Sequence, residues 1–184
     1  MKPYVMGIDI GGTNTVFGIV DTRGAVIASG SIKTGKYSDI NDYIDDLYNE
    51  ASRLIAANDA VGKIHGIGIG APNACYFTGI IEDGVNLPWP TPIPLAKLVR
   101  EKFGIPVAIT NDANAAAIGE MTYGAARGLK DFIMITLGTG VGSGIVIDGK
   151  VVYGHDGFAG ELGHLIVKRN NGRLCGCGRT GCLE

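Results

Sequence analysis

Several features that would mark particular classes of protein are missing from this sequence. No hydrophobic run approaches the roughly 18 residues of a membrane span, and no apolar stretch of signal-peptide length opens the chain. The 16 basic and 18 acidic side chains give a formal net charge of −2, which argues against a nucleic-acid groove and against a polybasic membrane surface. We therefore expect a cytoplasmic protein whose partners include neither nucleic acid nor a membrane.

Cysteine is also scarce, whereas glycine is abundant. Glycine accounts for 30 of the 184 residues, yet no Gly-X-Y repeat or Ser/Pro-rich tract accompanies it, which excludes collagen and low-complexity disorder. Three of the 4 cysteines lie at the end of the chain, and in a reducing compartment such crowding favours a metal site over a disulfide framework. Cys75 stands alone and is expected to be a buried small apolar residue.

Alternating β-rich and helical patterns predict an α/β fold. Short turns separate three β-rich runs over 4–9, 16–21 and 25–33, as in antiparallel hairpins. Apolar residues over 40–55 recur at helical spacing after Ser38 or Asp39, either of which can cap the helix. Strands then alternate with helices, which implies a parallel component in the sheet. The other expected strands cover 64–70, 107–110, 132–137 and 144–147. The other expected helices run from Pro94 or Leu95 to Phe103 and over 111–123.

The first glycine-rich turn, Asp9-Ile10-Gly11-Gly12-Thr13-Asn14, follows the first expected strand. Glycine lets backbone N–H groups approach phosphate oxygens, and the carboxylate of Asp9 can hold Mg²⁺ through water. The alternative is an ordinary hairpin turn in which Asp9 binds local amides.

A second glycine-rich segment, Gly138-Thr139-Gly140-Val141-Gly142-Ser143, links two further strands. It contains more glycine than a hairpin needs, which costs chain entropy unless something must come close. Neither segment is a Walker loop or a Rossmann fingerprint, because both connect strand to strand and no Gly-Lys-Ser/Thr follows. The sequence therefore predicts two β-hairpins that grip phosphates, in two similar half-domains that face a cleft and meet near Asn111.

Asn111 and Asp112 stand between an expected strand and an expected helix. A carboxylate in the first helical turn sits at the positive end of the helix dipole, which favours its ionised form. Asp112 is thus available as the base that accepts the proton of an attacking hydroxyl in phosphoryl transfer. The alternative is that Asn111 caps the helix and Asp112 only begins it.

The last part of the chain carries a set of metal-binding side chains. Cys175 and Cys177 are separated by one residue, Cys182 follows them and His164 precedes them. One imidazole and three thiols are the N/S ligands that tetrahedral Zn²⁺ takes. Glu161 lies three residues before His164, so a helical turn would place both on one face. The alternative is three reduced thiols and a core histidine.

Together these motifs resemble those of the actin-like ATPase and sugar kinase superfamily. Asp9-Ile10-Gly11-Gly12-Thr13 and Leu137-Gly138-Thr139-Gly140 are similar to its two phosphate loops, and the cysteine-rich tail is similar to that of the ROK family of sugar kinases and sugar-responsive repressors. The resemblance implies an actin-like ATPase (ribonuclease H-like) α/β fold with mixed sheets flanked by helices. It also implies an N-terminal half-domain over 1–111 and the start of a second, incomplete one over 112–184. The residues expected to hold ATP and Mg²⁺ are Asp9, Gly11, Gly12, Thr13, Gly138, Thr139 and Gly140.

The same resemblance assigns a sugar site, a metal site and an activity. The implied activity is ATP-dependent phosphorylation of a hexose, glucose by family pattern, with Asp112 as the catalytic base and a homo-oligomer as a possible assembly. The residues assigned to the sugar are Asn111, Asp112, Glu161, His164, Glu184 and, in a segment similar to the family's cleft lining, Asn86. The residues that match the family's structural zinc motif are His164, Cys175, Cys177 and Cys182.

Two functions other than catalysis stay open on the sequence alone, a sugar-responsive regulator and a non-catalytic, zinc-stabilised sugar-binding domain. Repressors of this family carry a helix-turn-helix ahead of the first phosphate loop, whereas Asp9 lies close to the first residue of this sequence, so we expect no such element here. N-acetylglucosamine, mannose, fructose and allose kinases share most of the same residues. ROK kinases continue well beyond the zinc motif, so we expect this chain to be a truncated form that is weak or inactive alone.

Overall fold

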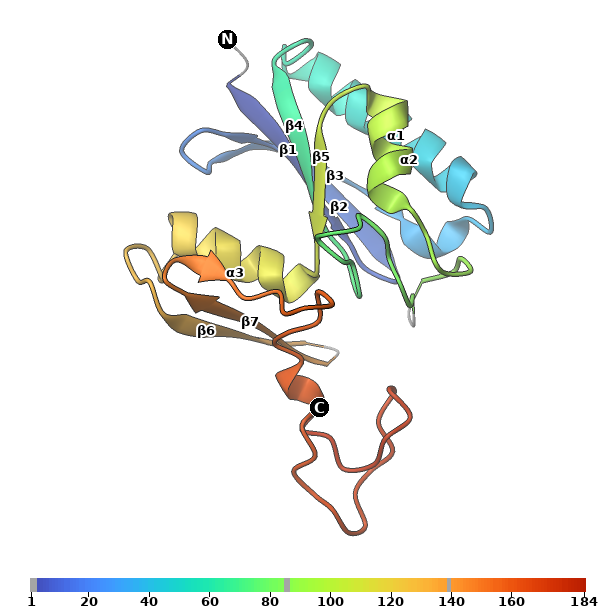
Figure 1. The fold of residues 1–184 in the computed structure, drawn as a ribbon. Helices are drawn as coiled ribbons and strands as arrows, with labels where there is room; N and C mark the ends of the chain where they lie inside the picture. The colour runs from blue at the N-terminus through green and yellow to red at the C-terminus, as the bar shows by residue number, and fades with distance from the viewer. Residues whose placement is uncertain (1–2, 85–86, 139) are drawn as a thin grey trace. The chain divides into compact units, whose positions relative to one another are not determined.

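The computed structural model describes residues 3–84, 87–138 and 140–184, which belong to two compact units. The first unit, Met1–Asp112, contains a five-stranded sheet. The second, Ala113–Glu184, contains a three-stranded sheet followed by a long irregular segment, as the ribbon in Figure 1 shows. Both units combine strands with helices, so the fold is mixed α/β.

The first unit is built on a sheet that has both antiparallel and parallel strand pairs. Its strands are β1 (Tyr4–Ile10), β2 (Asn14–Asp21), β3 (Val26–Lys33), β4 (Ile64–Gly70) and β5 (Val107–Thr110). The strand order is β3-β2-β1-β4-β5, with β1 to β3 antiparallel, β4 parallel to β1 and β5 parallel to β4. The carboxyl ends of β1, β4 and β5 therefore lie at one edge, which is where open α/β sheets bind ligands.

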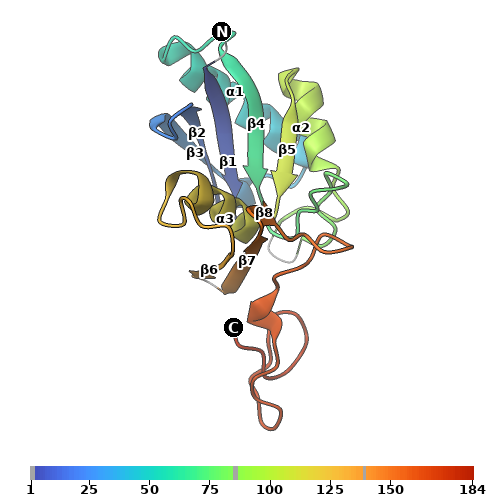
Figure 2. The ribbon, with the colours of Figure 1, turned by 60° about the vertical axis from the view of Figure 1, so that its left-hand side comes forward.

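Helices cover one face of this sheet (Figures 1 and 2). They are α1 (Ile40–Ala57) and α2 (Leu95–Phe103), and a short 3-10 helix, η1 (Thr34–Lys36), follows β3. The Asp39 carboxylate accepts a hydrogen bond from Asn41 N at 2.7 Å, so Asp39 and not Ser38 caps α1. α2 ends at Gly104, whose φ of 67° lies in the left-handed region that favours glycine. Within the described ranges, no helix has the length and apolar character needed to cross a bilayer.

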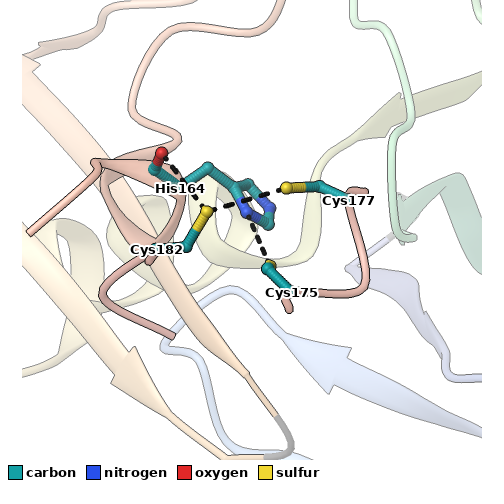
Figure 3. A group of neighbouring side chains, drawn as sticks. All are labelled: His164, Cys175, Cys177 and Cys182. Atoms are coloured by element: carbon teal, nitrogen blue, oxygen red, sulfur yellow. Dashed lines mark hydrogen bonds between the residues drawn. The ribbon is translucent and has the colours of Figure 1, made fainter. Parts of the chain in front are cut away.

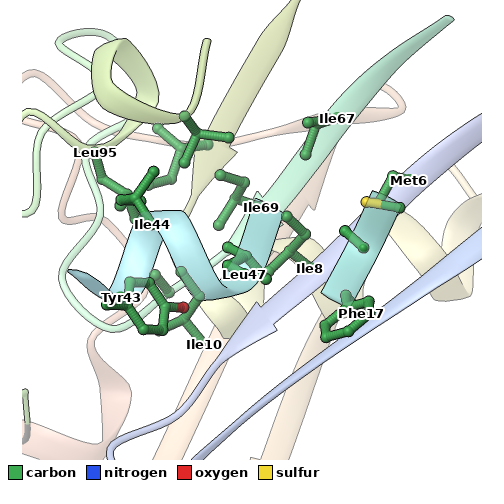
Figure 4. Packing of buried hydrophobic residues seen from close by; sticks show 14 of the residues in the cluster. Met6, Ile8, Ile10, Phe17, Tyr43, Ile44, Leu47, Ile67, Ile69 and Leu95 are labelled. Atoms are coloured by element: carbon green, nitrogen blue, oxygen red, sulfur yellow. The ribbon is translucent and has the colours of Figure 1, made fainter. Parts of the chain in front are cut away.

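The hydrophobic core of the first unit lies between the sheet and these helices. Alternate residues of β1 enter it, namely Met6, Ile8 and Ile10, and α1 contributes Tyr43 and Leu47, which are completely buried (Figure 4). Burying a large apolar side chain contributes about 1.5–3 kcal/mol. This packing is what holds α1 against β1 and fixes which side chains of the sheet point away from the core.

The proline-rich segment 88–94 belongs to the same core and is not a linker between independent domains. Trp89 and Ile93 are buried, and the Trp89 and Tyr43 ring centroids are 4.5 Å apart. Cys75 is also buried, which confirms the expectation that it behaves as a small apolar residue.

The second unit contains a small antiparallel sheet and one long helix. Its elements are α3 (Asp112–Tyr123), β6 (Phe132–Leu137), β7 (Val141–Ile147), β8 (Lys150–Val151) and the 3-10 helix η2 (Leu162–His164). The strand order is β6-β7-β8, and the irregular segment follows it to the end of the chain.

Most expected elements are present, with several boundaries shifted by one or two residues, a larger shift at the start of β7 and one additional strand. β2 begins at Asn14 and not at Val16, and β8 was not expected. The prediction of a turn over 138–143 is wrong at its end, because β7 already begins at Val141 and only 138–140 connects the strands. The reason is that strands tolerate glycine where a neighbouring backbone comes close.

Two glycines of β7 allow that close approach. A Cβ at Gly142 would lie 3.1 Å from the Ala113 Cβ, and a Cβ at Gly144 would lie 2.7 Å from the Ala117 Cβ. Ala113 and Ala117 are one helical turn apart on α3. The excess of glycine at these two positions therefore serves the packing of α3 on β7 and not a ligand.

Gly144→Ala should lower the free energy of unfolding by about 1–3 kcal/mol. The new methyl group would overlap the Ala117 Cβ and would lie 2.9 Å from the Ala113 carbonyl oxygen. Denaturant unfolding measures the effect. Gly68→Ala in β4 is the matched control, because a Cβ there has no atom within 4 Å, and an equal loss in both variants would contradict the packing argument.

Candidate functional site

The carboxyl edge of the first sheet collects polar groups from three parallel strands. Asp9 in β1 pairs with Gly70 in β4, and Gly70 pairs with Thr110 in β5, so the three residues form one row across the sheet. Asp9 and Thr110 lie on the face opposite α1 and α2, because their neighbours along each strand point into the core. Asn111 and Asp112 follow β5 directly and reach the same edge.

Asp9 and Asp112 are close enough to interact electrostatically. Burial raises the pKa of Asp9, and the negative charge of Asp112 raises it further. The Asp9 side chain nevertheless stays accessible to solvent, so a ligand can reach it. A cation between two such carboxylates would relieve their repulsion, and oxygen ligands of this kind suit Mg²⁺.

A buried network of hydroxyl groups lies behind the first glycine turn. The Thr15 Oγ1 lies 2.9 Å from the Thr34 Oγ1 and 2.8 Å from the Tyr43 hydroxyl oxygen, and all three side chains are completely buried. Thr34 N donates to the Thr13 carbonyl at 3.0 Å. Burial raises the pKa of Tyr43, so its hydroxyl stays protonated and available to the network. These bonds tie the end of the turn to η1 and α1.

The second glycine turn contacts the last residue of the chain. Gly138 N donates to the Gly140 carbonyl at 3.0 Å, whereas Thr139 lies outside the described residues. Val141 N donates to the Glu184 carboxylate at 3.3 Å. A Cβ at Gly140 would lie 2.5 Å from Oε2 of Glu184, so only glycine lets this carboxylate come so near. Glu184, which the resemblance assigns to a sugar, thus lies against the predicted phosphate turn.

Four potential metal ligands converge in the irregular segment of the second unit (Figure 3). They are His164, at the end of η2, and Cys175, Cys177 and Cys182, and their ligand atoms all lie within 4.8 Å of one another. Cys175 N donates to the Arg179 carbonyl at 2.8 Å, which closes the loop that carries the first two thiols. Residues far apart in sequence therefore form one N/S cluster.

Two of the distances between these atoms match those in a tetrahedral zinc site. Ordinary zinc bond lengths place two sulfur ligands about 3.8 Å apart, and a sulfur and a nitrogen ligand about 3.6 Å apart. Cys177 Sγ lies 3.7 Å from Cys182 Sγ, and Cys175 Sγ lies 3.6 Å from His164 Nδ1. The cluster is compatible with Zn²⁺ held by three thiolates and by Nδ1 of His164.

A nearby carboxylate and the protonation of the thiols both bear on how the cluster would bind a metal ion. Glu161 Oε2 lies 3.9 Å from Nε2 of His164, the ring nitrogen that does not face the thiols, and a carboxylate that hydrogen-bonds to this nitrogen would orient a metal-bound imidazole. The Arg179 backbone N–H lowers the pKa of Cys177 to about 7, whereas desolvation raises the pKa of Cys182 to about 11. At neutral pH the cluster retains protons, which a bound metal would displace.

The structure thus brings the predicted residues together within each unit in three groups. The three groups are Asp9 with Asp112, Gly140 with Glu184, and His164 with Glu161 and the three cysteines. Gly11, Gly12 and Thr13 occupy the turn after β1, and Asn111 immediately precedes α3. Asn86 lies outside the described residues.

The sequence-based prediction did not include Thr110. Its Oγ1 is buried at the carboxyl edge of the sheet, in the same row as Asp9, and has no hydrogen-bond partner among the described residues. A buried hydroxyl of this kind is a candidate ligand contact. No local signal marks it, because threonine is an ordinary residue in a strand.

The sequence profile of the ROK family matches residues 5–184. The chain belongs to the ROK family. A glucokinase of Halalkalibacterium halodurans is 40% identical over 185 residues, which cover 98% of this chain and 55% of the relative. An N-acetylmannosamine kinase of Vibrio cholerae is 36% identical over 179 residues (97% and 60%), and a xylose repressor of Caldicellulosiruptor bescii is 43% identical over 122 residues (66% and 30%). The chain spans about half the length of the glucokinases that it matches.

Solved structures of ROK proteins have the same fold. A ROK glucokinase from Streptomyces griseus, solved with glucose and AMPPNP, superposes with a TM-score of 0.80 at 37% identity, over 97% of this chain and 55% of that one. A ROK hexokinase from Thermus thermophilus gives a TM-score of 0.83 at 35% identity, over 98% and 59%. The mixed sheets flanked by helices are therefore those of the ROK sugar kinases, as the resemblance implied.

Asp9→Asn should stabilise the fold at pH 7 by under about 1 kcal/mol, a small figure because the group is solvent-accessible and its charge is screened. The pKa of Asp9 is raised in the folded state, so the stability linked to its protonated form is present at low pH and is lost as the pH rises through the folded value. The advantage of the variant should therefore vanish near pH 3. Urea unfolding at both pH values measures it, and an advantage that grows toward low pH would contradict the assigned direction.

Zinc added to metal-free protein should raise its thermal unfolding temperature, and a chelator should reverse the rise. Free metal at about 100 times its dissociation constant stabilises a fold by about 2.7 kcal/mol. Cys182→Ser should abolish the response, whereas Cys75→Ser, in the first unit, should keep it. A response that survives in the Cys182 variant would rule out the four-ligand site.

Proposed function

We propose that the protein is an ATP-dependent hexose kinase that transfers a phosphoryl group from ATP to the terminal hydroxyl of glucose. The observation that carries the proposal is that Asp9 and Asp112 interact electrostatically at the carboxyl edge of the first sheet. In kinases one carboxylate holds the metal–nucleotide complex and another accepts the proton of the attacking hydroxyl. ROK membership and the likeness to the Streptomyces griseus glucokinase, solved with glucose and AMPPNP, support the same reaction.

The two glycine turns are the proposed phosphate sites. Backbone N–H groups at glycines, which carry no side chain, can approach phosphate oxygens closely. Asp9 would hold Mg²⁺, which neutralises phosphate charge when it is bound. The residues proposed for this task, besides Asp9, are Gly11, Gly12, Thr13, Gly138, Thr139 and Gly140.

Asp112 is the proposed base, with Asn111 as its partner in orienting the sugar. The terminal hydroxyl oxygen bonds to the γ-phosphorus while the bond from that phosphorus to the bridging oxygen of ADP breaks. The Asp112 carboxylate accepts the hydroxyl proton in the same step. The position of Asp112 in the first turn of α3 supports this role, because the helix dipole favours a negative charge there.

The remaining sugar hydroxyls are assigned to residues around the Cys/His cluster. Carboxylates accept two or more hydroxyl hydrogen bonds in a fixed plane. Zn²⁺ on the three thiolates and on Nδ1 of His164 would fix the imidazole and supply no Lewis-acid chemistry to the transfer itself. The residues proposed for this part of the site are Glu161, His164, Glu184 and, as a further candidate, Asn86.

A sensor that binds sugar without phosphorylating it is the second candidate. The match to a xylose repressor, 43% identical over 122 residues, favours it. The presence of both Asp9 and Asp112 favours the kinase, because binding alone does not require two interacting carboxylates. The match to an N-acetylmannosamine kinase makes that sugar the alternative substrate to glucose.

ADP release coupled to a spectroscopic readout, with glucose, N-acetylmannosamine or no sugar, tests the kinase. Asp112→Asn should lower kcat by about 10²–10⁴ while sugar binding is largely kept, because the base contributes to chemistry and little to affinity. Asp42→Asn, which changes a first-turn carboxylate of α1, is the matched control and should keep full turnover.

Sugar binding without sugar-dependent ADP release, in this chain and in a version extended to the length of its relatives, would favour the sensor. Full turnover in the Asp112 variant would contradict the assigned base.

A further inference from the structure

Glu184 contacts both the second glycine turn and the Cys/His cluster, which is the group His164, Cys175, Cys177 and Cys182. The proposed function gives these two features separate roles. One of the Glu184 carboxylate oxygens, Oε2, accepts a hydrogen bond from Val141 N at 3.3 Å. The other, Oε1, lies 3.8 Å from Sγ of Cys175, one of the predicted metal ligands. All of these residues belong to the second unit.

The backbone around the cluster determines where Glu184 lies. Glu184 follows Cys182 by two residues, and its N–H donates to the Gly163 carbonyl at 3.0 Å. Leu183 N donates to the Leu165 carbonyl at 2.9 Å. Since Gly163 and Leu165 flank His164, a metal that joins His164 to Cys182 also crosslinks the two backbone segments that hold Glu184.

The same segment packs on the first residues of β7. A Cβ at Gly163 would lie only 2.1 Å from the Val141 carbonyl oxygen, so backbone meets backbone there. The Ser143 hydroxyl donates to the Gly160 carbonyl, and Leu162 N donates to the Ser143 Oγ at 3.2 Å. Val141 therefore packs against Gly163 on its carbonyl side and donates its N–H to Glu184 on the other.

Val141 closes the turn over 138–140, because it pairs with Leu137 at the base of that hairpin. A side chain at Gly140 would displace the Glu184 carboxylate, whereas a Cβ at Gly138 has no atom within 4 Å. The two glycines of one turn thus differ, since only Gly140 makes room for the carboxylate.

We propose that Glu184 is a positioning residue through which metal occupancy of the Cys/His cluster fixes the second glycine turn. The carboxylate holds the Val141 amide, and without the metal this hold is lost. The inference rests on the proposed metal site but not on the identity of the sugar. A carboxylate has room for several donors, so the Val141 bond and a sugar hydroxyl do not exclude each other.

Amide hydrogen exchange, followed by NMR on the full chain, tests the proposal, with zinc content measured in every sample. In zinc-loaded protein, Glu184→Ala should raise the exchange rate of the Val141 amide at least about tenfold, as loss of a hydrogen bond to a charged group predicts. The Val152 amide, which donates to the Ile145 carbonyl at 2.8 Å, is the internal reference and should not change.

Two comparisons distinguish loss of the Glu184 contact from a general rise in amide exchange across the second unit. Gly140→Ala should accelerate the exchange of Val141 as Glu184→Ala does, whereas Gly138→Ala should not. A chelator should accelerate this exchange in the wild type but add little in Glu184→Ala, because both changes remove the same contact.

Each outcome decides between the two claims. If the wild type binds no zinc, the metal site fails and the proposal fails with it. If zinc binds but the Val141 amide exchanges equally in wild type and Glu184→Ala, or the chelator acts equally in both, the link through Glu184 is wrong although the metal site stands.

Discussion

The parallel pairing of β4 with β1 and of β5 with β4 is the constraint on which the first unit depends. Parallel neighbours cannot be joined by a tight turn, so α1 and α2 must cross over, and their apolar faces bury the core side of the sheet. The pairing also brings the three carboxyl ends to one edge. Asp9 and Asp112 interact electrostatically there although more than one hundred residues separate them.

The interaction of Asp9 with Asp112 destabilises the folded state when both are ionised, and the packing of the rest of the unit offsets this effect. Burial and the charge of Asp112 both disfavour the ionised form of Asp9, so the site is less stable without a cation than a neutral pair would be. The core beneath it and the hydroxyl network of Thr15, Thr34 and Tyr43 hold the surrounding backbone in place. A perturbed pKa of this kind is typical of sites that bind charged ligands.

The second unit buries few large side chains among its described residues, and its elements instead pack closely at glycines. Gly142 and Gly144 let α3 contact β7, and Gly163 lets the segment that carries the metal ligands contact the start of the same strand. Little regular structure holds this last segment, which makes a metal crosslink an effective stabiliser. These three glycines are therefore explained by close packing and not by the proposed phosphate turns.

Much of the molecule follows from local patterns: the helical spacing of α1, the hairpins of β1 to β3, the burial of Cys75, and a cysteine-rich tail that belongs to the ROK family. These were predictable because propensity, periodicity and motif spacing act over a few residues. The contact of Glu184 with Val141 and the buried Thr110 hydroxyl were not. The sequence by itself determined the elements and the chemical groups, whereas only the tertiary structure decided which groups meet, because such contacts depend on backbone paths set by packing over long sequence separations.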